Sequence, residues 1–182
     1  MRIIAGIHRG RVLGSPRDLS VRPTTDRAKQ TIFDILSNRM LFEGMQVLDL
    51  FAGTGSLGLE AISRGVSTVT FVDNSRESLA VLKKNVAALH CEDQCTMYQA
   101  DVFWYLRNTQ AKYDLVFADP PYKLEKIGTI PRSLSESGVL KPRAFVVMEH
   151  SRESAVDLDE QYYDILRKPF GQTTVLILQN KN

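Results

Sequence analysis

A short strand that leads into a glycine-rich loop and then a helix restricts the fold of this chain more than any other part of its sequence. Residues 47–50 are apolar apart from Asp49, and Gly53, Gly55 and Gly58 follow. Beyond the loop, apolar residues recur at helical spacing. This order predicts an α/β fold in which backbone N–H groups of the loop face a bound cofactor.

The cofactor is predicted from the residue before the loop. The three glycines match G-x-G-x-x-G, which is typical of dinucleotide sites and also of simple turns. Asp49 argues against a dinucleotide, because a carboxylate four residues before the first glycine would face the position of the pyrophosphate. It suits a cation such as the amino group of S-adenosylmethionine. The cofactor-binding residues expected here are Asp49, Phe51, Ala52, Gly53, Thr54 and Gly55.

Two further strands are predicted to end in carboxylates. Asp73 closes the strand predicted over 67–73 and lies 20 residues beyond Gly53, a spacing at which an acidic side chain reaches a ribose. Asn74 follows it. The strand predicted over 95–100 leads to Asp101, which could accept the adenine amino group while the N–H of Val102 meets the ring, or could cap a helix. In that helix we expect Trp104 and Tyr105 to pack in the core.

The chemistry is predicted for the end of a fourth strand, over 113–118, which continues into Asp119-Pro120-Pro121-Tyr122. The two prolines stiffen the turn at the sheet edge where α/β folds bind ligands. The Asp119 carboxylate and the Pro120 carbonyl can accept the protons of a flat exocyclic amine, and Tyr122 can stack on its base. We expect Asp119, Pro120 and Tyr122 to be catalytic. Glu149 ends the fifth strand, predicted over 144–148, without a role that the sequence assigns.

The first 30 residues are basic. They contain seven Lys or Arg against two Asp, a net charge of +5, so the remainder carries −3. A hairpin is predicted over 2–13 and a helix from residue 24. Guanidinium groups bind phosphate through paired hydrogen bonds, so RNA is the expected partner, with a solvated surface as the alternative. The expected RNA-binding residues are Arg2, Arg9, Arg11, Arg22, Thr25 and Arg27.

Composition is that of an ordinary globular protein. The 182 residues are 43% hydrophobic and 24% charged, which suits one domain with a small appendage. We divide them into an RNA-binding hairpin and helix over 1–43 and a catalytic domain over 44–182. Residues 1–6 are too short for a signal-peptide core and no apolar run reaches the length of a membrane span, so the cytoplasm is expected. Cys91 and Cys95 are expected to be reduced structural thiols, and no metal is expected.

These motifs together resemble the RsmD family of 16S rRNA guanine-N2 methyltransferases, and the resemblance covers nearly the whole chain. It is carried by residues 22–27 (Arg-Pro-Thr-Thr-Asp-Arg), by residues 47–58 as motif I, by residues 119–122 as motif IV and by residues 170–173. Gln172 departs from the family pattern, in which an acidic residue is expected.

The resemblance implies a Rossmann-like class I S-adenosylmethionine-dependent methyltransferase. It further implies a seven-stranded sheet with an antiparallel C-terminal hairpin, over 162–167 and 173–179, plus a small N-terminal extension. The implied substrate is the N2 of guanine 966 in 16S rRNA, within the small ribosomal subunit or its assembly intermediate. We expect a monomer. Two alternatives stay open: an adenine-N6 methyltransferase of DNA or RNA, and a non-catalytic RNA-binding assembly factor.

Overall fold

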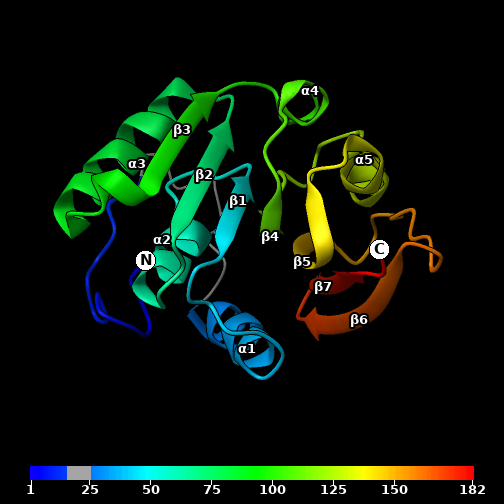
Figure 1. Cartoon of the computed structure of the whole chain (residues 1–182), viewed down its shortest axis with the longest axis horizontal. Helices are drawn as coiled ribbons and strands as arrows, with labels where there is room; N and C mark the ends of the chain where they lie inside the picture. The colour runs from blue at the N-terminus through cyan, green and yellow to red at the C-terminus, as the bar shows by residue number, and fades with distance from the viewer. Residues whose placement is uncertain (16–25) are drawn as a thin grey trace.

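The computed structural model describes residues 1–15 and 26–182, whose strands form one seven-stranded sheet in the order β3-β2-β1-β4-β5-β7-β6 (Figure 1). The strands are β1 (Gln46–Leu50), β2 (Thr68–Asp73), β3 (Cys95–Gln99), β4 (Tyr113–Ala118), β5 (Leu140–Ser151), β6 (Tyr163–Phe170) and β7 (Thr173–Asn180). The α-helices are α1 (Asp26–Ser37), α2 (Ser56–Ser63), α3 (Arg76–Leu89), α4 (Val102–Asn108) and α5 (Ile130–Ser137). Short 3-10 turns, η1 (Glu92–Gln94) and η2 (Ile127–Thr129), lie between them.

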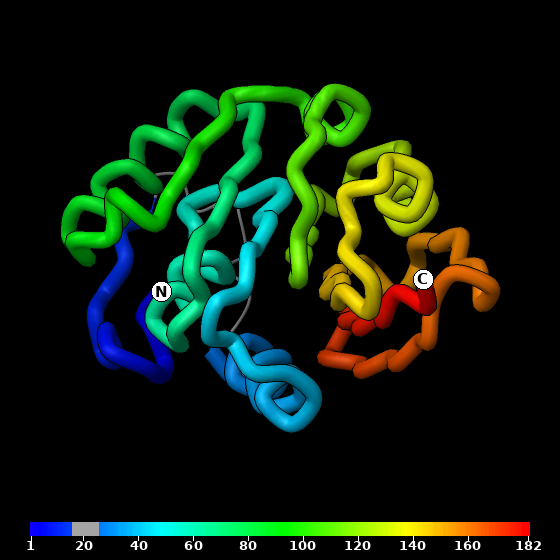
Figure 2. Tube along the Cα trace, viewed as in Figure 1, coloured from blue at the N-terminus to red at the C-terminus, as the bar shows by residue number. Residues whose placement is uncertain are grey.

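Strand direction fixes where a ligand can bind. In the order of the sheet, β3, β2, β1, β4 and β5 pair in parallel. In contrast, β7 is antiparallel to both β5 and β6. The chain runs from β1 to β2 on one side, and β4 joins β1 on the other side, as the trace in Figure 2 shows. The strand order therefore reverses between β1 and β4. In open α/β sheets the crevice at the carboxyl ends of these strands is the ligand site.

The sheet is covered by helices on both faces. Alternate residues of each strand point to opposite faces, so Val47 packs in one core with α1, α2 and α3, and Leu48 packs in the other with α4 and α5. In β4, Phe117 and Val116 divide in the same way. The strands are apolar on both sides because both faces are buried, which is typical of parallel sheets. Among the described residues, every helix is too short or too polar to span a membrane.

The first helix after β1 lies directly against β2. A side chain at Gly58 would collide with the ring of Phe71, so only glycine permits this close approach. The third glycine of the sequence motif therefore has a packing role. It lets the N-terminal end of α2, and with it the glycine loop, lie against the sheet.

Residues 1–15, here called the N-terminal arm, fold back on themselves without forming regular strands. The predicted hairpin is present as one antiparallel bridge between Arg2 and Val12, with the Ile3 N–H donating to the Arg11 carbonyl at 2.9 Å. Turns occupy the residues between them. Strand pairing does not extend further because the arm bonds to α2 instead: the Ile7 N–H donates to the Ser63 carbonyl at 2.8 Å.

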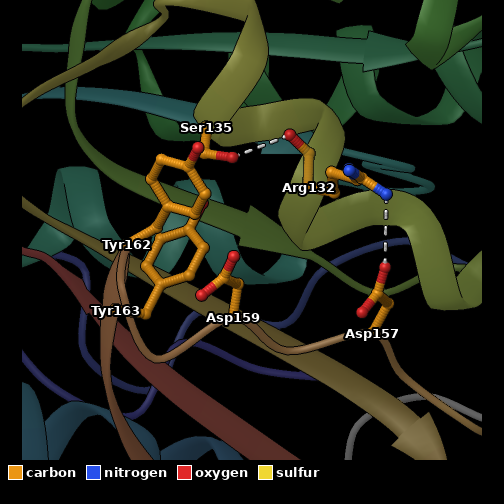
Figure 3. Close-up of a pocket in the computed structure, with 6 residues that line it drawn as sticks. All are labelled: Arg132, Ser135, Asp157, Asp159, Tyr162 and Tyr163. Atoms are coloured by element: carbon orange, nitrogen blue, oxygen red, sulfur yellow. Dashed lines mark hydrogen bonds and ion pairs between the residues drawn. The ribbon is translucent and has the colours of Figure 1, made fainter.

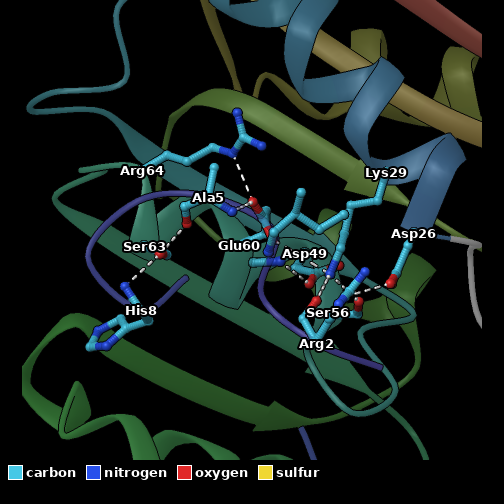
Figure 4. A network of polar contacts seen from close by, with 12 residues as sticks. Arg2, Ala5, His8, Asp26, Lys29, Asp49, Ser56, Glu60, Ser63 and Arg64 are labelled. Carbon is cyan, nitrogen blue, oxygen red and sulfur yellow. Dashed lines mark hydrogen bonds and ion pairs between the residues drawn. The ribbon is translucent and has the colours of Figure 1, made fainter. Parts of the chain in front are cut away.

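A buried ionic network joins the arm to α1 and α2 (Figure 4). Glu60, 0% exposed, accepts the backbone N–H groups of Ile4 at 2.7 Å and Ala5 at 3.1 Å. It also accepts from the Arg64 Nε at 2.8 Å, and Lys29, 1% exposed, lies 3.5 Å away. One carboxylate thus fixes the arm, α1 and α2 relative to each other.

Lys29 completes this network at the end nearest the glycine loop. Its Nζ donates to the Arg2 carbonyl at 2.7 Å and to the Ser56 Oγ at 3.2 Å. Ser56 is the first residue of α2. Burial lowers the pKa of Lys29, and the attraction of Glu60 opposes that shift. Arg2 and Ser56 hold the Lys29 Nζ in place, and Glu60 stabilises its charge.

Several strand boundaries differ from the sequence predictions by one residue, and three elements differ by more. The helix predicted from residue 133 begins at Ile130, because Pro131 occupies its first turn, where the missing N–H costs nothing. The fifth strand is longer than 144–148, since β5 already starts at Leu140. Pro169 lies inside β6 without breaking the sheet, because β6 is an edge strand.

Candidate active site

The glycine loop is held by Asp73, one of the predicted cofactor residues. Its two carboxylate oxygens accept the N–H groups of Gly53 and Ser75, each at 2.8 Å. The loop begins with Phe51 at φ 56°, an uncommon left-handed conformation for a residue with a side chain. Such backbone persists only where neighbouring contacts enforce it. Asp73 therefore shapes the loop, in addition to the ribose contact that we predict for it.

The remaining loop residues are bonded to the surrounding fold. The Ala52 N–H donates to the Val72 carbonyl of β2 at 3.2 Å, and the Gly55 N–H donates back to the Ala52 carbonyl at 2.8 Å. The Thr54 carbonyl accepts the side-chain amide of Asn85 from α3 at 3.0 Å. Because Asn85 also bonds to Gly14, the arm reaches the loop from this side too.

Asp49 is buried below the loop, 2% exposed. One of its oxygens accepts the Gly58 N–H at 2.9 Å, in the first turn of α2. Burial raises the pKa of Asp49 well above its usual range, the Gly58 bond opposes this, and the negative charges of Asp119 and Asp73 raise it further. A cation placed beside this carboxyl would offset the desolvation and the repulsion.

Two roles were predicted for Asp101, and the structure shows the helix cap. Asp101 is the N-cap of α4, and its carboxylate accepts the Trp104 N–H at 2.8 Å. The predicted adenine contact is compatible with this role, since Asp101 is exposed beside the buried Val102. Asn74 is exposed after β2. The expectation for Trp104 was wrong: its side chain is 53% exposed, whereas Tyr105 is buried. Position 104 falls on the outward side of α4, a direction that two adjacent aromatics did not reveal.

The proline corner after β4 contains the predicted catalytic residues. Pro120 is buried, and Asp119 lies between buried and exposed. Tyr122 follows at a tight turn, in which the Leu124 N–H donates to the Pro121 carbonyl at 2.9 Å. Tyr122 is 44% exposed. The corner thus presents a carboxylate and an aromatic ring at the carboxyl edge of the sheet.

Glu149 is the residue that the sequence did not assign. It lies near the carboxyl end of β5 and its Oε1 accepts the hydroxyl proton of Tyr122 at 3.2 Å. The available signal was its position: an acidic residue closing the strand that follows the proline corner along the chain. The bond to Tyr122 could not be read from sequence, because the two residues are 27 positions apart.

The predicted RNA-binding residues fall into two places. Arg27 lies in the first turn of α1. Arg2, in the N-terminal arm, lies beside it and its Nε donates to Asp26 at 2.9 Å. Arg9 and Arg11 lie beyond the turn of the arm, which bonds to Ser63 at the far end of α2. All four are exposed. Arg22 and Thr25 lie outside the described residues.

A pocket on the opposite edge of the sheet contains none of the predicted site residues (Figure 3). Its lining is Arg132, Ser135, Asp157, Asp159, Tyr162 and Tyr163. Tyr163 starts β6 and pairs with Asn180, so the pocket lies where the parallel strands begin rather than end. Over residues 1–15 and 26–182, no three His, Cys, Asp or Glu side chains are grouped to hold a metal ion. The thiols of Cys91 and Cys95 are 3.9 Å apart.

Known proteins are similar to this chain in sequence and in fold. A family described as Conserved hypothetical protein 95 matches residues 1–179. The chain is 34% identical over 187 residues to the rRNA methyltransferase candidate YlbH of Bacillus subtilis, covering 100% of both proteins. It is 33% identical over 183 residues to Ribosomal RNA small subunit methyltransferase D of Haemophilus influenzae, covering 99% of this chain and 94% of that protein. The solved structure of the methyltransferase candidate yhhF of Escherichia coli covers 100% of this chain and 98% of its own, with TM-score 0.88 and 30% identity. The chain therefore belongs to this family, the RsmD family, and has the fold of class I S-adenosylmethionine-dependent methyltransferases.

Proposed function

We propose that this chain transfers a methyl group from S-adenosylmethionine to the exocyclic N2 of a guanine in 16S rRNA. The observation that carries the proposal is the placement of the proline corner beside the glycine loop. β1 and β4 pair in parallel with Leu50 opposite Ala118, so the glycine loop and the proline corner follow neighbouring strands at the same edge of the sheet. The group that would hold the base amine and the group that would face the cofactor are therefore neighbours.

The residues of the loop fit a cationic nucleoside cofactor. Asp49 is a buried carboxylate whose charged form is disfavoured by its surroundings, so a nearby cation would stabilise it. Gly53 has a φ of 54°, and among the described residues other than its chain neighbours, the nearest atom to a side chain built there is the Phe51 carbonyl oxygen at 4.0 Å. That space beside the loop backbone is available to a ligand. Asp49 would face the amino group, Asp73 the ribose, and Asp101 with Val102 the adenine.

The chain's own residues would act by orientation. The cofactor, when bound, supplies a methyl group on a positively charged sulfur, which is a good leaving group. The guanine N2 lone pair is delocalised into the ring, so the amine must become more tetrahedral to react. Hydrogen bonds from its two protons to the Asp119 carboxylate and the Pro120 carbonyl favour that geometry, and as the amine is methylated one of these protons leaves N2 through the Asp119 carboxylate. Stacking on Tyr122 holds the base in place, and such positioning lowers the barrier by several kcal/mol.

The substrate is the finer part of the proposal. Two relatives carry rRNA methyltransferase in their names, one of them of the small subunit. From the motifs that the chain shares with the RsmD family we further propose guanine 966 of 16S rRNA as the target, in the small subunit or its assembly intermediate. We further propose a monomer acting in the cytoplasm, with the substrate-binding part over 1–43 and the catalytic part over 44–182. No metal enters this mechanism.

The test is a methylation assay with small ribosomal subunits that lack the modification. With labelled S-adenosylmethionine, we expect label in one rRNA guanine, recovered as N2-methylguanosine after digestion to nucleosides. N6-methyladenosine would instead identify the adenine methyltransferase. Tight rRNA binding without incorporation, together with no heat of donor binding in calorimetry, would identify a non-catalytic assembly factor.

Donor affinity is expected to rise with pH through the titration of Asp49. Because burial raises the pKa of this carboxyl, the free enzyme retains a proton there above the usual range near pH 4. A bound cation favours the charged form, so binding must release that proton, and affinity falls as pH drops below the raised pKa. Calorimetric titrations between about pH 5 and pH 8, in buffers of different ionisation enthalpy, measure both the affinity and the proton release.

Asp49→Asn is the matched variant for this experiment. It keeps the shape and the acceptor for the Gly58 N–H but removes the titration, so we expect about tenfold weaker binding at neutral pH and a flat pH profile. S-adenosylhomocysteine, which lacks the sulfonium charge but keeps the ammonium group, tells which cation Asp49 faces. A pH dependence that persists in Asp49→Asn would assign the titrating group elsewhere.

The arm is expected to bind RNA through charge. Replacing both Arg9 and Arg11 with alanine removes two exposed cations. Each phosphate that the protein no longer neutralises lowers the slope of log affinity against log salt by about one, so we expect weaker rRNA binding and a slope smaller by about two. Filter binding at several salt concentrations measures this.

A control pair of the same charge change comes from the opposite side of the molecule. Arg143 and Arg167 are exposed on β5 and β6. Their double replacement should leave the salt slope unchanged. An equal fall in both double variants would mean that net charge, and not the arm, governs binding.

A further inference from the structure

Asp119 and Glu149 lie next to each other at the carboxyl edge of the sheet, Asp119 as the first residue after β4 and Glu149 within β5, where it pairs with Val175. The strands β4 and β5 are parallel, and Ala118 pairs with Met148. The residues that follow this pair are Asp119 and Glu149, and the backbones of adjacent strands lie about 5 Å apart. Two carboxylates therefore lie at one corner of the site, although the proposed mechanism uses only one of them.

Tyr122 connects the second carboxylate to the base site. Its hydroxyl donates to the Glu149 Oε1 at 3.2 Å, while the side chain remains 44% exposed. The bond sets the direction of the ring on which the target base would stack. It also holds Glu149 next to that ring. A carboxylate has about four acceptor positions, of which the bond from Tyr122 occupies one.

A second carboxylate distinguishes guanine from adenine. The guanine edge next to N2 carries the N1–H, which is a donor, so N1 and N2 together present adjacent donors. Beside its exocyclic amine, adenine presents N1 as an acceptor, whose lone pair a carboxylate repels. One carboxylate beside one carbonyl would serve either amine. A further carboxylate placed against N1 favours guanine.

We infer that Glu149 is the residue that selects guanine, by accepting the N1–H of the base while Asp119 and Pro120 hold its N2. This inference rests on the proposed function. In this role Glu149 contacts the base and is positioned by Tyr122, and it does not take part in methyl transfer itself. Its removal should therefore change which base is accepted more than it changes donor binding.

The experiment compares guanine with 2-aminopurine at the target position. 2-Aminopurine has the same exocyclic N2 amine, but its N1 is an acceptor. Small subunits are reconstituted with rRNA ligated from two pieces, so that the target is one base or the other. With the unaltered enzyme we expect kcat/KM for guanine to exceed that for 2-aminopurine by about 10- to 100-fold, since one hydrogen bond to a charged group is replaced by repulsion.

Glu149→Gln should bring this ratio to within about threefold of one, because the amide can accept from guanine N1 or donate to 2-aminopurine N1. Glu153→Gln, an exposed neighbour on the same segment, is the control and should keep the unaltered ratio. A purely structural role for Glu149 would lower kcat/KM for both bases equally and leave the ratio unchanged, which would overturn the inference. Failure of the unaltered enzyme to form N2-methylguanosine would overturn the proposed function as well, so the two failures are distinct.

Discussion

Replacement of Asp119 with alanine is expected to lower kcat about 10³-fold while donor affinity changes by less than about threefold. The reason is the division of work in the site. Asp49, Asp73 and the glycine loop form the proposed cofactor side, and the Asp73 carboxylate holds that loop through the Gly53 N–H, a bond in which Asp119 takes no part. Single-turnover methylation of small subunits measures the rate, and calorimetry with S-adenosylmethionine measures the affinity.

Two further variants separate chemistry from charge. Asp119→Asn keeps the shape of the side chain but offers one acceptor and an N–H₂ group in place of the carboxylate, so we expect it to be nearly as impaired. Glu125→Gln removes an exposed carboxylate from the same loop and should leave kcat unchanged. Equal losses of turnover and donor binding in Asp119→Ala would contradict the assigned role, because they would place Asp119 on the cofactor side.

Sequence reasoning was reliable where the signal is local. The apolar run of β4 and the prolines after it fix both a strand and a rigid end, so the position of Asp119 at the sheet edge follows from about ten residues. Asp73 ends β2 as predicted, whereas its hydrogen bond to the Gly53 N–H is a contact that the 20-residue spacing did not predict. Parallel neighbours end at one edge, and for that reason their terminal carboxylates gather there.

Contacts between distant segments could not be predicted in this way. Glu60 lies on a helix that reads as a simple apolar stripe, yet it binds backbone N–H groups of residues 55 and 56 positions away. Lys29 appears in the sequence as one more basic residue of the N-terminal segment, whereas its Nζ is buried and bonded to Arg2 and Ser56. The hydrophobic pattern and the charge of a segment predict the helix or strand that it forms. The partners of Glu60 and Lys29 depend instead on how separate elements pack together.

Glu60→Gln is expected to cost about 3–5 kcal/mol of unfolding free energy, the largest stability loss among the variants considered. The amide keeps the size of the side chain but leaves the buried cation of Lys29 without its counterion. It also weakens the acceptors for the Ile4 and Ala5 N–H groups. Urea unfolding followed by circular dichroism measures the loss as a lower midpoint at unchanged slope.

The partner variant tests whether the loss comes from an unpaired charge. Lys29→Met alone should cost less, about 1–3 kcal/mol, because Glu60 retains Arg64 and both N–H groups while the Arg2 carbonyl loses its donor. The double variant should lose less unfolding free energy than the two single variants together, because the methionine removes the cation that Glu60→Gln leaves unpaired. Glu136→Gln, in the exposed Arg132–Glu136 pair, is the control and should cost less than about 0.5 kcal/mol. If the two losses are strictly additive, Lys29 and Glu60 act independently. In the Glu60→Gln variant, faster proteolysis within residues 1–15 would show that the contact with the arm has loosened.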